Sequence, residues 1–343
     1  MRSFGSDNHS GVHPLIMEAL INANKDHALG YGEDQWTEEA VEKIREAFTP
    51  DCKPLFVFNG TGCNATGLQL LTRPYQTIYC AATAHIQCDE CGAPTKETGC
   101  SLTLIPTDDG KLTPELIENV MTGVGEQHHA QPGAIYLTNA TELGTIYTPA
   151  EIKKITDFAH KHDMYVHMDG ARICNAAVAL GVSLRELTVD CGIDTLAFGG
   201  TKNGLLIGEC LIVFNKLFTK QAKYVRKQSA QLASKMRFIS CQFTAMFTND
   251  LWKVCATQAN EKAQMLYSKL KQFPDVHFTQ EHDSNQLFLT LPIHIAKKMQ
   301  EKFHFFFWNE AKGEIRLVTS FDTTDEDIDC FISELSRLLT STK

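Results

Sequence analysis

Short apolar runs alternate with helical patterns over the first two thirds of this 343-residue chain, and this alternation constrains the fold more than any other feature. Strands are expected near 56–58, 78–81, 102–105, 134–138, 165–168, 195–198 and 211–214, with helices between several of them. Strands that alternate with helices form mostly parallel sheets covered on both faces. The sequence therefore predicts an α/β fold with a mixed, mostly parallel sheet.

One helix start is marked by a capping box. Thr148 precedes Pro149, and Glu151 stands three residues after the threonine. This spacing lets the threonine and glutamate side chains satisfy each other's backbone N–H groups, and proline suits the first helical position. A helix is therefore predicted to begin at Pro149.

The pattern changes after about residue 246. A long helical pattern covers 251–270, short strands are expected near 286–291, 305–308 and 315–319, and a last helix opens at Thr324. We therefore expect a large domain over 1–246, including the N-terminal segment, and a small C-terminal α+β domain over 247–343.

The charge balance limits the kind of partner. The chain has 32 Lys and Arg against 41 Asp and Glu, a formal net charge of -9. An acidic protein is a poor candidate for binding nucleic acid or an anionic membrane. A stretch without acidic residues, 210–249, leaves a nucleic-acid patch as an alternative, although it lacks regularly spaced aromatic residues. No apolar run long enough to span a bilayer and no signal-peptide pattern are apparent, so a cytoplasmic protein is expected.

The twelve cysteines are scattered along the chain, and free thiols are expected. Cys88 and Cys91 have metal-like spacing, with His85 and Cys100 nearby. A structural zinc site normally needs a second pair of ligands at suitable spacing. No such pair is evident, so the sequence predicts no metal and leaves zinc as an alternative.

Three motifs follow expected strands, where ligands of open parallel sheets bind. The first, Asn59-Gly60-Thr61-Gly62-Cys63-Asn64, has small residues at a helix start. Helix N-termini offer N–H groups and the positive end of a dipole, which suits a phosphate. A plain tight turn is the alternative interpretation.

The other two motifs carry Asp169, in 167–172, and Lys202, between small residues in 198–204. The two residues are 33 positions apart (202 minus 169), the length of one strand–helix–strand crossover, so they should end parallel strands at the same edge. A carboxylate for a pyridine nitrogen and a lysine for an aldehyde are what pyridoxal 5′-phosphate (PLP) needs. A helix cap and a surface lysine remain the alternatives.

These motifs carry a resemblance to a known family. The matching segments are Gly5-Ser6-Asp7-Asn8, Tyr31-Gly32-Glu33-Asp34, Asn59-Gly60-Thr61-Gly62 with Asn64, Ala84-His85, Met168-Asp169-Gly170-Ala171-Arg172, Phe198 to Gly204 and Ile315-Arg316-Leu317-Val318. They run in order over about residues 3 to 325. The chain resembles the low-specificity L-threonine aldolases, PLP enzymes of fold type I in the aspartate-aminotransferase-like superfamily.

The resemblance implies roles around the cofactor. Lys202 would carry PLP as a Schiff base, Asp169 would pair with the pyridinium, and His85 would stack on the ring. Gly60 and Thr61 would hold the phosphate. The remaining cofactor contacts would come from Arg172 and, across a subunit boundary, from Lys227 and Arg237.

It also implies roles around the substrate. Ser6, Arg172 and Arg316 would hold the substrate carboxylate, which a planar guanidinium meets with two parallel bonds. Tyr31 would approach from a neighbouring subunit, and His128 would be a second active-site histidine. The residues alone leave other interpretations open: His85 as a core or surface histidine, His128 as a solvated loop residue, and Arg316 as a solvent-facing charge.

The function implied is cleavage of L-threonine, L-allo-threonine and related β-hydroxy-α-amino acids, such as phenylserine, to glycine and an aldehyde. Another PLP lyase acting by β-elimination, or an aminotransferase, is the alternative on the same scaffold. A non-catalytic binding protein is a third possibility, although the retained Lys202 and Asp169 speak against it. A homotetramer, built as a dimer of dimers, is expected.

Overall fold

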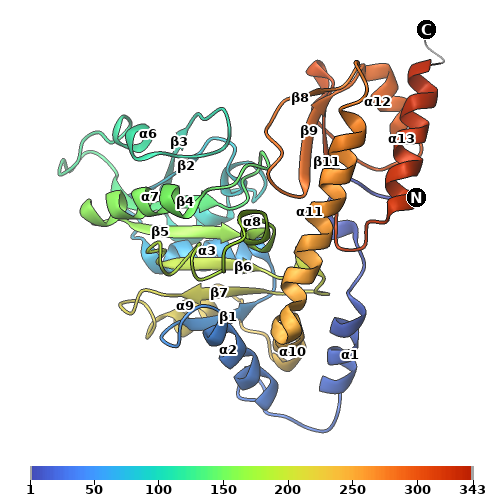
Figure 1. Ribbon diagram of the computed structural model, residues 1–343. Helices are drawn as coiled ribbons and strands as arrows, with labels where there is room; N and C mark the ends of the chain where they lie inside the picture. The colour runs from blue at the N-terminus through green and yellow to red at the C-terminus, as the bar shows by residue number, and fades with distance from the viewer. Residues whose placement is uncertain (1, 341–343) are drawn as a thin grey trace.

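Two β-sheets organise the chain in the computed structural model, which describes residues 2–340 (Figure 1). The larger sheet has seven strands in the order β1-β7-β6-β5-β4-β2-β3. Its strands are β1 (Lys53–Val57), β2 (Gln76–Ala81), β3 (Ser101–Ile105), β4 (Gln131–Thr138), β5 (Tyr165–Gly170), β6 (Thr195–Gly199) and β7 (Glu209–Val213). β7 pairs antiparallel with its two neighbours, β1 and β6, and the other strand pairs of this sheet are parallel. The predicted mixed, mostly parallel sheet is confirmed.

Helices cover both faces of the large sheet, and the strands alternate between two cores. In β6, Leu196 and Phe198 join the core beneath α7 (Pro149–Lys161) and α8 (Ile173–Leu180), whereas Ala197 joins the core beneath α3 (Gly60–Leu71). Because side chains on a strand alternate in direction, a buried apolar run can serve both cores. The other helices of this part are α1 (Pro14–Ala23), α2 (Gln35–Ala47), α4 (His85–Cys88), α5 (Ala93–Thr98), α6 (Pro114–Glu118), α9 (Ala222–Gln228) and α10 (Arg237–Phe247).

The second sheet is antiparallel, in the order β10-β11-β9-β8. Its strands are β8 (His277–Phe278), β9 (Gln286–Thr290), β10 (Phe306–Asn309) and β11 (Glu314–Val318), with helices α12 (Ile293–Gln300) and α13 (Asp325–Thr340). The long helix α11 (Leu251–Leu270) leads into this part (Figure 1). Leu251 packs in the core of the large sheet, and Leu266 packs in the core of the small one. The expected small α+β unit is confirmed.

The first residues of the chain lie against the small sheet, whereas Ile16 of the same N-terminal segment packs in the core of the large sheet. Phe4 is fully buried in the small core. Its N–H donates to the carbonyl of His304 at 2.7 Å, and its carbonyl accepts from the N–H of Val318 at 2.7 Å. A segment this short carries no periodic pattern, so its sequence could not indicate which core it completes.

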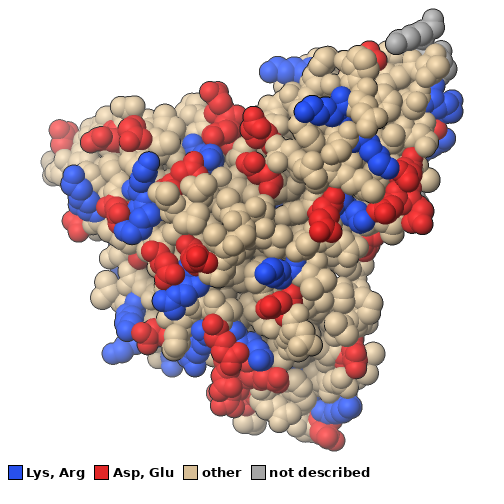
Figure 2. Space-filling model, viewed as in Figure 1, with Lys and Arg blue, Asp and Glu red and all other residues tan. Residues whose placement is uncertain are grey.

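Charge is mixed on the face shown in Figure 2, where Lys and Arg alternate with Asp and Glu over both parts of the molecule. Among residues 2–340, no helix is both long and apolar enough to cross a membrane.

The capping box of α7 forms as expected and gives a test of the local prediction. The N–H of Glu151 donates to Thr148 Oγ1 at 3.3 Å, and the N–H of Thr148 donates to Glu151 Oε2 at 2.7 Å. Thr148→Ala should lower the free energy of unfolding by about 1 kcal/mol, because an N-cap acceptor is lost. Urea unfolding should detect this loss, and Thr148→Ser should restore most of it. Equal stability of all three proteins would contradict the prediction.

Candidate active site

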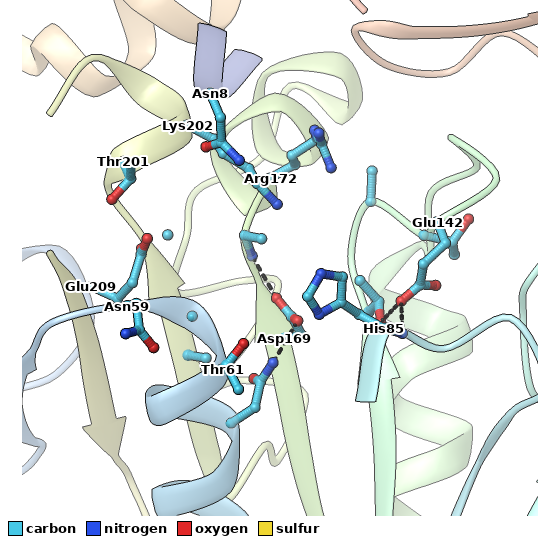
Figure 3. Close-up of a pocket in the computed structure, with 18 of the residues that line it drawn as sticks. Asn8, Asn59, Thr61, His85, Glu142, Asp169, Arg172, Thr201, Lys202 and Glu209 are labelled. Carbon is cyan, nitrogen blue, oxygen red and sulfur yellow. Dashed lines mark hydrogen bonds between the residues drawn. The ribbon is translucent and has the colours of Figure 1, made fainter. Parts of the chain in front are cut away.

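A cavity of about 440 Å³ opens at the carboxyl edge of the large sheet. Its lining includes Gly60, Thr61, His85, Asp169, Arg172 and Lys202, all of them predicted from sequence. Figure 3 shows Asp169 near the centre, with His85 on one side, Lys202 and Arg172 above it and Thr61 below it. The parallel strands bring these residues together because β2, β4, β5 and β6 all end at this edge.

Asp169 closes β5 and is held as a carboxylate. Its Oδ2 accepts from Tyr136 Oη at 2.7 Å and from Asn64 Nδ2 at 2.8 Å, and its Oδ1 accepts from the N–H of Ala171 at 2.9 Å. Burial alone would raise the pKa of Asp169, but the positive charge of Lys202 and these two side-chain donors lower it. The cavity therefore contains a buried carboxyl group whose pKa is held below its usual value.

Lys202 follows β6 in a short turn whose glycines are required by the packing. A Cβ added to Gly199 would lie 2.5 Å from the carbonyl oxygen of Ala171, so the Gly199 backbone can run there only without a side chain. Burial and the nearby Arg172 lower the pKa of the Lys202 ammonium. A larger neutral fraction makes this amine a better nucleophile toward an aldehyde.

The start of α3 forms a cradle suited to an anion. Asn59 caps the helix: its Oδ1 accepts from the N–H of Gly62 at 2.8 Å. The first N–H groups of a helix have no partner within the helix, and here those of Gly60 and Thr61 lie at the cavity. A Cβ added to Gly60 would meet nothing within 4 Å, which leaves room for a ligand. This set of donors fits a phosphate group.

Two arginines and one carboxylate meet near the small domain. Arg172 donates from Nε and Nη2 to the two carboxylate oxygens of Asp7, each at 2.8 Å. Arg316 donates to the carbonyl of Gly5 at 3.3 Å, and its Nε is buried without an acceptor among the described residues. Burial and the charge of Arg172 lower the pKa of Arg316 to about 10. Because the single carboxylate of Asp7 balances only one of the two guanidinium charges, a net positive charge remains here, which favours an anionic ligand.

Asp7 was not predicted as a partner of Arg172. It is buried, and Ser6 beside it donates from Oγ to Asp7 Oδ1 at 3.4 Å. Asn285 also donates to Asp7 Oδ2 at 3.2 Å. Asp7 therefore holds one edge of the Arg172 guanidinium, and Nη1 is left for a ligand. Sequence alone gave no sign of this pairing, because the partners are 165 positions apart.

Comparison with known proteins identifies the family. The model of the beta-eliminating lyases matches residues 3–292. The chain belongs to this family. It is 38% identical to a low specificity L-threonine aldolase of Pseudomonas aeruginosa over 95% of both chains. A second one, from a Pseudomonas species, is also 38% identical, over 94% of both chains.

The fold of the beta-eliminating lyases is shared as well. The solved structure of a threonine aldolase from Leishmania major matches with a TM-score of 0.93 and 28% identity. The match covers 98% of this chain and 99% of that one. The resemblance noted in the sequence is confirmed, as is the fold class that it implied.

Three residues to which the resemblance gave a role lie outside the cavity of their own chain. Tyr31 and Lys227 are exposed and adjacent, with Lys227 Nζ 5.5 Å from the centre of the Tyr31 ring. Arg237 donates to the carbonyls of Lys25 and Asp26, both at 3.2 Å. These three residues do not line the cavity of their own chain.

The structure does not place His128 at the cavity of its own chain, where a second active-site histidine was expected. His128 is exposed in the loop before β4, at the amino edge of the sheet. The eight residues of β4 separate the two edges by roughly 26 Å at about 3.3 Å per residue. Parallel strands begin at one edge of a sheet and end at the other, so the position of His128 just before β4 puts it at the edge opposite the cavity.

The cysteine spacing does not produce a zinc site. Cys88 and Cys91 are exposed free thiols, and Cys100 is buried with its Sγ donating to the carbonyl of Arg73 at 3.1 Å. Among the described residues, the one group with metal-like geometry is His85, Glu90 and Asp169, whose ligand atoms lie within 4.8 Å of one another. No cysteine belongs to this group.

Glu209 was also missed by the sequence analysis. It begins β7, and because β7 runs antiparallel to β6, its first residue lies at the same edge as Lys202. Its Oε2 accepts from the N–H of Gly200 at 2.6 Å. Burial raises the pKa of Glu209 from 4.5 to about 7. A carboxyl in an apparently ordinary strand, Glu209-Cys210-Leu211, carried no signal of this environment.

The raised pKa of Glu209 predicts a pH-dependent stability. Between about pH 4.5 and pH 7 the folded chain keeps this proton and the unfolded chain has lost it, so stability falls as pH rises through that window. Ionised Glu209 lowers the free energy of unfolding by about 3 kcal/mol at about pH 8. Glu209→Gln should remove this loss of stability. Urea unfolding of the cofactor-free proteins should show the variant as more stable at about pH 8, with the gap closing near pH 4. A gap that does not depend on pH would contradict the assignment.

Proposed function

We propose that this chain is a PLP-dependent aldolase that cleaves L-threonine, L-allo-threonine and related β-hydroxy-α-amino acids to glycine and an aldehyde. The observation that carries the proposal is the shared cavity of Lys202 and Asp169, which close neighbouring parallel strands. The names of the Pseudomonas relatives support the same reaction.

The donor set at the cavity fits PLP. Lys202 would supply the amine for its aldehyde, Asp169 would keep the pyridine nitrogen protonated, and the N–H groups of Gly60 and Thr61 would hold its phosphate. His85 is suited to lie against the ring. When bound, PLP supplies the electron sink that accepts the electrons left on Cα as a bond there breaks.

The arginine pair orients the substrate. Arg316 and the open Nη1 of Arg172 bind its carboxylate, and Ser6 contributes through its contact with Asp7. Holding the carboxylate fixes the rotation about the bond between Cα and the amino nitrogen. This rotation decides which bond to Cα is aligned for cleavage. Asp7 keeps the guanidinium of Arg172 in place before the substrate arrives.

His85 is the histidine that can move a proton within the same chain. Its Nδ1 lies 2.8 Å from Glu90 Oε1, which leaves Nε2 to take the proton of the substrate β-hydroxyl. His128 was expected to act at this hydroxyl, but it lies at the far edge of the sheet in its own chain. We therefore assign the role to His85.

We also propose that the protein acts in the cytoplasm and assembles as a homotetramer, a dimer of dimers. Tyr31, Lys227 and Arg237 do not line the cavity of their own chain, and the two positive groups among them suit the phosphate of a neighbouring copy, with Tyr31 suiting its substrate. The mixed charge of the chain gives no reason to add nucleic acid or membrane as a partner.

The reaction is tested by incubation with L-threonine. Acetaldehyde and glycine should appear in equal amounts, whereas β-elimination would give a keto acid and ammonia, and transamination would give no aldehyde. Borohydride should fix PLP on Lys202, and peptide mapping should find the label there. Lys202→Ala should lose turnover, because the amine is gone, and remain folded. The exposed Lys298→Ala is the matched control and should keep both label and rate.

Sharing of sites between subunits is tested by mixing two impaired variants. Lys202→Ala lacks the amine, and the double variant Lys227→Ala with Arg237→Ala lacks the groups offered to the neighbour. If the site is shared, denaturing and refolding the two together should restore about a quarter of the native activity through hybrid dimers. No recovery, together with an active monomer by light scattering, would contradict the shared site.

A further inference from the structure

The carboxylate of Glu90 is buried directly behind His85. Its side chain has 0% exposure, and its Oε1 lies 2.8 Å from His85 Nδ1. The same oxygen accepts from Asn64 Nδ2 at 2.8 Å. The other oxygen, Oε2, is buried without a hydrogen-bond partner in the described chain. Glu90 stands in the turn between α4 and α5 and does not line the cavity.

This arrangement is costly for a residue that serves only packing. A buried carboxylate oxygen without a donor loses its hydration without compensation, and an apolar residue of similar size would avoid the loss. Buried ionisable groups next to a cavity, each with a specific charge partner, are typical of functional sites. The partner here is the one histidine that lines the cavity.

The hydrogen bonds determine where the proton of His85 lies. Glu90 Oε1 already accepts from Asn64 Nδ2, so this oxygen is an acceptor and His85 donates to it from Nδ1. Nε2 then carries the lone pair and remains available on the cavity side. The backbone N–H of His85 donates to Glu142 Oε1 at 2.8 Å, which holds the start of α4.

Asn64 ties this pair to the cofactor end of the cavity. Its Nδ2 also donates to Asp169 Oδ2 at 2.8 Å, so one amide group bridges the two buried carboxylates. The amide is held in this orientation because His167 Nε2 lies 3.0 Å from Asn64 Oδ1. Burial lowers the pKa of His167 to about 4, so that ring is neutral, and its Nε2 donates to the amide oxygen.

We propose that Glu90 is a positioning residue that holds His85 in the Nδ1–H tautomer, shares its proton and presents Nε2 to the substrate β-hydroxyl. This inference rests on the proposed aldolase function and adds the group through which His85 works. It is the arrangement by which a carboxylate orients a catalytic imidazole in a nucleophile–histidine–acid triad.

The charges around His85 agree with this role. The hydrogen bond that His85 donates to Glu90 is the largest cause that raises the pKa of His85, burial opposes it, and the charge of Asp169 adds to it. Lys202, the cation facing the ring, lowers it. Removal of the Glu90 charge should therefore move the pKa of His85 down.

Glu90→Gln tests the proposal because it keeps the shape of the side chain and removes its charge. We expect kcat to fall by roughly 10- to 10²-fold, less than the full loss of a general base. The acid limb of kcat/KM should move to lower pH, because His85 loses its proton more readily. The affinity for PLP, measured by absorbance titration of the cofactor-free protein, should change by less than about threefold, which corresponds to a small difference in binding free energy.

A second readout does not depend on activity. Titration of the cofactor-free protein by NMR, with isotope-labelled histidine and His85 assigned from His85→Phe, should give a lower pKa for His85 in Glu90→Gln. Glu142→Gln is the matched control: it also removes a carboxyl group near His85, but one that accepts from the backbone N–H of His85 and from Thr138 Oγ1 and makes no hydrogen bond to the ring. It should shift the ring titration less.

A double-variant comparison separates positioning from a general structural effect. In a His85→Phe background, Glu90→Gln should have little further effect on kcat, because its action runs through the histidine. Independent losses that multiply would overturn the proposal. So would an unchanged His85 pKa in Glu90→Gln.

The outcome is also distinguishable from failure of the proposed function. If the wild-type protein releases acetaldehyde from threonine but Glu90→Gln matches its rates and pH profile, the inference fails and the function stands. If the wild-type protein has no aldolase activity, the function fails, and the NMR titration still decides the His85–Glu90 pair. Should Glu90→Gln not fold, a wild-type His85 pKa below its ordinary value overturns the inference.

Discussion

The carboxylate of Asp169 is the group on which the site depends. It is buried at the end of β5, and burying a charge is unfavourable unless donors surround it. Tyr136 and Asn64 provide those donors from β4 and α3, two elements that are otherwise part of the core. The hydrogen bonds that stabilise the buried carboxylate therefore also connect β4 and α3 to the wall of the cavity.

From Asp169 the polar contacts extend in both directions. Asn64 connects it to Glu90 and so to His85, which carries the proposed proton transfer. Lys202 faces it across the cavity and lowers its pKa, while the lysine is itself pushed toward its neutral form by burial and Arg172. A negative group and a weakened cation are held close together without a direct ion pair between them. This leaves the lysine amine available for chemistry.

The part of the site near the small domain has an excess of positive charge, in contrast to the surroundings of Asp169. Two arginines meet one carboxylate, Asp7, and that carboxylate comes from the segment that completes the small domain. Arg316 lies on β11 of the small sheet, and Arg172 follows β5 of the large one. The two guanidinium groups therefore come together only where the two parts of the chain meet, and the proposed binding of a substrate carboxylate there depends on the packing of the small domain.

The sequence by itself determined the strand–helix alternation, the capping box at Thr148, and the placement of Asp169 and Lys202 at the ends of neighbouring strands. These are local or nearly local features, set by periodicity and by one crossover. Only the tertiary structure decided the partners: Glu90 behind His85, Asp7 on Arg172, and Glu209 at the site because β7 runs antiparallel. It also placed Phe4 in the small core. Contacts between distant residues depend on strand order and direction, and the pattern of one segment does not record them.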